Sequence, residues 1–200
     1  ACAPYRRLHL CSHNLESIDT KNYDSGNAKH KLLAEVCMAA KFEGESLRSQ
    51  HGKHKLDNNN PDFKICTVLA RSFADIGDIV RGRDFFLGND EEKKKRKQLK
   101  KNLRTIFEKI KGNNNSTLNG LPLDKVREYW WDANRQEIWK AITCGTHKGD
   151  TYFRPTCNSS DTKGPSQAHD KCRCDDNPNT DPPTYFDYVP QYLRWFEEWA

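Results

Sequence analysis

Eight cysteines constrain the fold of this chain more than any other feature. They are spread over the whole 200 residues as Cys2, Cys11, Cys37, Cys66, Cys144, Cys157, Cys172 and Cys174. This distribution favours long-range disulfides in an oxidising compartment over one compact metal site. Only 35% of the residues are hydrophobic, so a small core would gain from such cross-links. We expect an extracellular domain in which Cys37, Cys157, Cys172 and Cys174 are bridged, although eight cysteines allow 105 connectivities.

Apolar residues recur at helical rather than strand spacing. From Cys66 onward, for example, they follow every three or four residues, as on the buried face of a helix. The same spacing predicts five helices, one beginning near Lys29 and the others covering residues 61–80, 90–111, 122–143 and 190–199. Residues 1–28, the polar stretch 50–62 and residues 146–183 lack this period and are predicted to be irregular. The predicted fold class is all-α, a disulfide-linked helical bundle with long irregular loops.

The sequence offers little for chemistry. It contains none of the short motifs that mark P-loop, dinucleotide, metalloprotease or serine-hydrolase sites. The seven histidines lie mostly in polar stretches, without a nucleophile or carboxylate at helical spacing. Cys172 and Cys174 with His169 form a weak zinc pattern, but a second pair of ligands is missing. We therefore predict a binding protein rather than an enzyme, with no metal and no cofactor.

Two classes of partner are disfavoured by the same composition. No run of apolar residues approaches the length that spans a membrane, so direct membrane insertion is not expected. Nucleic acid is also a poor candidate, because disulfide-rich chains rarely meet it.

Positive charge is concentrated in residues 90–111, which hold ten Lys or Arg against four Asp or Glu. The helix face opposite the apolar seam carries Lys93, Lys94, Lys97, Lys100, Lys101 and Arg104. Such a row can bind the sulfates or phosphates of a polyanion with salt-sensitive affinity. The alternative is a solvated face that merely keeps the protein soluble. We predict that these six residues bind a glycan.

The five tryptophans allow two interpretations. Trp130, Trp131, Trp139, Trp195 and Trp199 could form a platform on which sugar rings stack, or they could fill the core. Most of them lie at core spacing on predicted helices, which favours packing. Trp131 lies off the predicted inner stripe, so it is the one candidate for stacking.

Several longer stretches resemble Duffy-binding-like domains of malaria parasites. Residues 1–11, ACAPYRRLHLC, are similar to the opening motif of that family, and residues 73–84, FADIGDIVRGRD, to its central block. The residues REYWW at 127–131 and PTYFDYVPQYLRWFEEW at 183–199 complete the set. The central block and REYWW are most similar to the alpha class of the erythrocyte membrane protein 1 family.

This resemblance implies a helical fold in subdomains. Residues 1–60 would form an irregular N-terminal part with the first helix, as in subdomain 1, and residues 61–200 the helical bundle of subdomain 2. The third, C-terminal subdomain would be absent from this chain. The family pattern also implies a Cys66–Cys144 disulfide. Cys2 and Cys11 would lack their usual upstream partners or pair with each other.

The resemblance also implies a function. The chain would be displayed on the extracellular face of the infected erythrocyte membrane, with its anchor outside this sequence, and would adhere to host receptors with antigenic variation. The implied partners are red-cell or endothelial glycans such as heparan-sulfate-like chains and blood-group sugars, or complement receptor, and rosetting would follow. Neighbouring domains of a larger membrane-anchored chain are expected as well. The alternative is a structural spacer or immune decoy whose adhesive site lies in those neighbouring domains.

Overall fold

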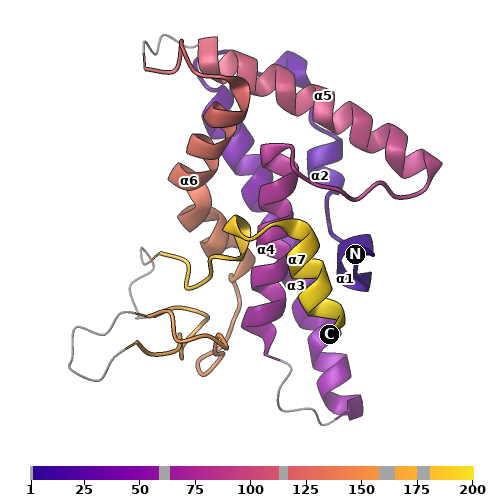
Figure 1. Ribbon diagram of the computed structural model, residues 1–200, viewed down its shortest axis with the longest axis vertical. Coiled ribbons are helices and arrows are strands. Elements are labelled where there is room, and N and C mark those ends of the chain that lie inside the picture. Colours follow the sequence, from indigo (N-terminus) through magenta and orange to yellow (C-terminus); the bar gives the residue numbers. More distant parts are fainter. Residues whose placement is uncertain (1, 59–63, 113–116, 158–164, 175–180) are drawn as a thin grey trace.

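The computed structural model describes residues 2–58, 64–112, 117–157, 165–174 and 181–200, and Figure 1 shows their course. The elements are α1 (Tyr5–Leu8), α2 (His13–Glu16), η1 (Thr20–Asn22), α3 (Ala28–Asn58), α4 (Ile65–Arg81), α5 (Asp90–Gly112), α6 (Leu123–Ile142), η2 (Phe186–Tyr188) and α7 (Gln191–Trp199). Within these ranges extended pairing is limited to two isolated bridges, Cys157–Ser166 and Asp170–Arg173. The all-α prediction is confirmed.

Helix α4 lies at the centre of the bundle, with α3, α6 and α7 packed around it (Figure 1). All of its residues except Thr67 and Arg71 are buried. The ring of Phe73 packs against Trp131 and Trp139 of α6, at centroid distances of 5.1 and 5.3 Å. A helix buried on every side must place its polar side chains against partners, because an unpaired buried charge costs several kcal/mol.

Those partners come from the two ends of the chain. Arg6 in α1 donates to Asp75 of α4 (2.7 Å) and to Glu198 of α7 (2.9 Å), and Arg194 also donates to Asp75 (2.7 Å). Burial alone would raise the pKa of Asp75, but the charges of Arg6 and Arg194 outweigh burial and hold that pKa below its usual value. The N- and C-terminal segments are thereby fastened side by side on α4 (Figure 1).

Two of the predicted irregular regions are partly helical. Helix α3 continues to Asn58, so the loop predicted for residues 50–62 is wrong for residues 50–58. This stretch is polar and has no apolar stripe, but an existing helix adds residues at little cost, so it extends without one. Residues 1–28 likewise contain α1, α2 and η1 rather than irregular chain throughout.

The disulfides differ from the pairing implied by the resemblance. Cys66 is bonded to Cys172 and not to Cys144, and Cys157 is bonded to Cys174. Cys66 and Cys172 are both fully buried, and the indole N–H of Trp139 donates to the backbone oxygen of Cys172 (3.2 Å). Cys144 lies just beyond the end of α6, where it is exposed and its thiol is free.

Cys37 is a second correction, because its thiol is free although a bridge was expected. It lies half-buried on α3. Burial and the nearby charge of Glu137 raise its pKa to about 11, so the thiol stays protonated at neutral pH. Cys2 and Cys11 are free as well.

Candidate functional site

The six predicted glycan-binding residues lie together on one face of α5, here called the α5 cationic face. Lys93, Lys94, Lys97, Lys100, Lys101 and Arg104 are all exposed. The opposite face of α5 is buried through Leu99, Leu103 and Ile106. Because apolar residues recur on one side only, the helix must present its other side to solvent. Helix α5 lies along the edge of the bundle (Figure 1).

Most of this charge is not neutralised. Lys93 pairs with Asp90 (3.2 Å) and Arg104 with Glu108 (3.0 Å), both within α5. Among the residues that the structure describes, Lys94, Lys97, Lys100 and Lys101 form no ion pair. A row of exposed, uncompensated ammonium groups attracts polyanions, and salt screens that attraction.

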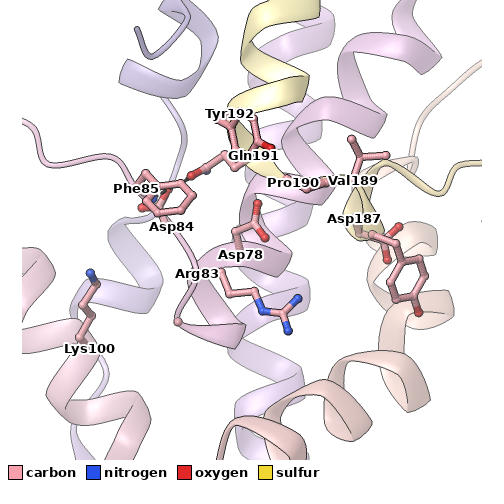
Figure 2. A pocket seen from close by; sticks show the side chains of 12 residues that line it. Asp78, Arg83, Asp84, Phe85, Lys100, Asp187, Val189, Pro190, Gln191 and Tyr192 are labelled. Atoms are coloured by element: carbon pink, nitrogen blue, oxygen red, sulfur yellow. Dashed lines mark hydrogen bonds between the residues drawn. The ribbon is translucent and has the colours of Figure 1, made fainter. Parts of the chain in front are cut away.

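A cavity of about 410 Å³ opens beside Lys100. Figure 2 shows Lys100 reaching toward it from α5, Arg83 and Phe85 from the chain after α4, and the 187–192 segment from the opposite side. Three exposed aromatic side chains line it, namely Phe85, Tyr188 and Tyr192. Aromatic rings held at an open cavity offer flat apolar faces to a ligand.

The three acidic residues that line this cavity are all paired with arginines, and Asp84 is paired with Arg7 and Arg96. Asp78 is paired with Arg194 and Arg81, and Asp187 with Arg135 (2.9 Å). Burial nevertheless raises the pKa of Asp78 to about 6. With these carboxylates engaged in the interior, a ligand at the opening meets the aromatic rings and the free ammonium of Lys100.

The tryptophans belong mainly to the core. Trp131, predicted as a stacking candidate, is fully buried, and its indole N–H donates to Asp187 (2.8 Å), so that prediction is wrong. Trp139 and Trp195 are buried as well, whereas Trp199 is 62% exposed beside the N-terminal segment. The cavity rings Phe85 and Tyr188 were missed, because only the folded chain brings them together with Lys100.

No group of three or more His, Cys, Asp or Glu side chains in the described part of the chain could hold a metal ion. None of the helices in the same part is long and apolar enough to cross a membrane. The residues gathered at the candidate site include cations and aromatic rings.

Comparison with known proteins gives this surface a context. The family model of the Duffy binding domain matches residues 1–194. The chain belongs to the Duffy binding domain family. This family consists of receptor-binding adhesion domains rather than enzymes, and its Duffy-binding members are surface-exposed parasite adhesins.

Individual relatives of this Duffy binding domain come from malaria parasites. The Duffy receptor gamma form of Plasmodium knowlesi is 22% identical over the whole chain, which covers 15% of that protein. The NTS-DBL1(alpha-1) domain of Plasmodium falciparum membrane protein 1 (PfEMP1) from the varO strain is 41% identical, with a TM-score of 0.79. A PfEMP1 DBLbeta domain bound to ICAM-1 is 31% identical, with a TM-score of 0.69. Both alignments include the whole of this chain, but they span only 43% and 44% of the chains in these two structures.

Proposed function

We propose that this Duffy binding domain is an adhesion module that binds acidic glycans on host cells through the α5 cationic face and the adjoining cavity. The observation that carries this proposal is the row of four exposed lysines without ion pairs among the described residues, on a helix side that faces solvent. Lysines kept for solubility alone would not need to lie beside an open cavity with three exposed rings. Heparan-sulfate-like chains match the charge of the face best.

The other implied partners fit this surface less well. Blood-group sugars carry little charge, so they could use the rings around the cavity but not the lysines. ICAM-1 is bound by the DBLbeta relatives, and a protein receptor would need a wider contact than one helix face. We extend to this chain, as part of the proposal, display on the outer face of the infected red cell and a place among neighbouring domains. A PfEMP1 structure that pairs a DBL1-alpha with a CIDR-gamma domain supports the latter.

Cell binding by the isolated, oxidised chain tests the proposal. The wild type should bind red cells or endothelial cells, and enzymatic removal of sulfated glycans should abolish that binding. Reversal of Lys94, Lys97, Lys100 and Lys101 to Glu should remove binding as well. The control variant reverses four exposed lysines elsewhere to Glu, namely Lys29, Lys41, Lys148 and Lys171. It changes the net charge by the same amount and should retain most of the cell binding.

Two results would contradict the proposal. Equal binding by both variants would show that the α5 cationic face is not the site. Absence of binding by the wild-type chain would favour the spacer or immune-decoy alternative, in which adhesion belongs to other domains.

A further inference from the structure

Arg127 is an exception among the buried arginines. The described part of the chain has five of them, Arg7, Arg81, Arg127, Arg135 and Arg194. Four pair with buried carboxylates: Arg7 with Asp84, Arg81 with Asp78, Arg135 with Asp187, and Arg194 with Asp75 and Asp78. No described acid pairs with Arg127, although only 9% of this residue is exposed. The neighbouring Glu128 is turned instead to Arg81 and Arg83.

The surroundings of Arg127 hold its side chain in place without neutralising it. The guanidinium lies over the ring of Phe107, 5.1 Å from the centroid. Its Nη1 atom lies against Gly82, where a Cβ would collide with it. The buried Nε atom has no hydrogen-bond partner. The charged group that acts on Arg127 is another cation, Arg104, and burial and Arg104 together lower the pKa of Arg127.

Such an arrangement is unfavourable for folding alone. Burial of a cation without a counter-ion destabilises the folded state, and an apolar side chain of similar size would be neutral or stabilising in its place. An unpaired charge that the fold holds in one orientation is better explained by a ligand that supplies the missing negative charge.

Arg127 adjoins both parts of the candidate site, the cavity through Gly82 and the α5 cationic face through Arg104, although it does not itself line the cavity. Gly82, against which its Nη1 packs, lines the cavity beside Lys100. Arg104, its charged neighbour, belongs to the α5 cationic face. A polyanion laid along the cationic face and into the cavity would pass this junction.

We propose that Arg127 is the anchor for one oxyanion group, a sulfate or a carboxylate, of the glycan bound at the α5 cationic face. The inference rests on the proposed function and names the group that gives the site selectivity beyond general charge. A guanidinium presents two parallel N–H donors that match the oxygens of a sulfate or carboxylate, which an ammonium cannot do. The surface lysines then attract the chain of sugars, and Arg127 fixes its register.

The test compares variants in affinity for heparin oligosaccharides and in thermal stability, at one fixed salt concentration. Arg127→Met should weaken binding by at least about tenfold, as expected for loss of a charge-assisted hydrogen bond. It should also unfold at the same temperature as the wild type or higher, because it removes an unpaired buried charge. Arg127→Lys keeps the charge but lacks the fork and should lose most of the same affinity. Arg154→Gln removes an exposed arginine charge outside the α5 cationic face and the cavity, and should cost no more than about twofold.

A parallel measurement with desulfated heparin identifies the oxyanion. If Arg127→Met loses its effect on the desulfated polymer, the anchored group is a sulfate. If the effect persists, it is a carboxylate.

The outcomes separate this inference from the proposed function. Wild-type affinity in both Arg127 variants, with loss of binding in the α5 reversal, would overturn the anchor and leave the cationic face standing. A fall in unfolding temperature of Arg127→Met and Arg127→Lys, without any change in affinity, would make Arg127 structural and overturn the anchor too. A wild-type chain that binds neither polymer would overturn both proposals.

Discussion

Residues of the four sequence blocks that resemble Duffy-binding-like domains form ion pairs and hydrogen bonds with one another, although the blocks lie far apart in the chain. Asp75 of the central block receives Arg6 from the opening block and Arg194 from the closing one. Trp131 of REYWW donates to Asp187 of the closing block. The blocks therefore specify the scaffold, because each holds a charge or donor that another must satisfy. The surface lysines carry no such requirement.

Asp75→Asn tests this network. The change leaves Arg6 and Arg194 without a full counter-charge, so we expect a loss of about 3–5 kcal/mol in the free energy of unfolding at neutral pH. Asp90→Asn, at a side chain that is 93% exposed, should change it by less than about 0.5 kcal/mol. Chemical denaturation of the oxidised proteins measures both values.

The stability difference between the wild type and Asp75→Asn should depend on pH in a predictable way. The folded-state pKa of Asp75 lies below the ordinary 3.8, so its stabilisation is present above pH 3.8 and is lost as pH falls through the folded pKa. The difference between wild type and Asp75→Asn should therefore shrink only in strong acid. A difference that disappears already near pH 6 would contradict the lowered pKa.

At the scale of elements, prediction succeeded where a helix packs on one side. The inner seam predicted for α5, Leu99 and Leu103 among it, is buried as expected, and its cationic side is exposed. Helix α6 packs against α3 and α4 and also binds the η2 segment. Its buried surface is therefore wider than one stripe, so Trp131 is buried although it lies off the predicted stripe. Periodicity cannot reveal a second packing partner that comes from 56 residues away.

The contact between α4 and α6 gives a second prediction. A Cβ at Gly77 would lie 2.7 Å from the ring of Trp131, and both are buried. Gly77→Ala should therefore destabilise the protein by about 1–3 kcal/mol, despite the better helix propensity of alanine. Gly112→Ala at the end of α5, where a Cβ meets no atom within 4 Å, is the matched control and should not destabilise. Thermal unfolding of both variants measures this difference. An unfolding temperature of Gly77→Ala equal to that of the wild type would contradict the predicted clash with Trp131.

At the scale of the whole molecule, the disulfides were the least predictable feature. Which buried cysteine faces Cys66 depends on how residues 165–174 fold back over α4 and α6, and no local pattern encodes that. The cationic face, by contrast, followed from the sequence because charge and helical period suffice to place it. The cavity and the unpaired state of Arg127 could not be predicted from the sequence, because they depend on segments that meet only in the folded chain.

The Cys66–Cys172 bridge should matter for stability. It closes a loop with a sequence separation of 106, for which chain entropy predicts a stabilisation of about 4–5 kcal/mol. Paired replacement of Cys66 and Cys172 by Ser should lower the free energy of unfolding by an amount of this order. Cys144→Ser, at an exposed free thiol, should have little effect. Equal stability of the two variants would contradict the assigned pairing.

The most direct test of the account is the salt dependence of binding to a sulfated oligosaccharide of defined length. We predict that the wild-type affinity falls steeply between about 50 and about 200 mM salt, with a slope set by the number of lysines engaged. Reversal of Lys94, Lys97, Lys100 and Lys101 should remove both the affinity and the slope. An affinity that is insensitive to salt, or one that survives this reversal, would contradict the account.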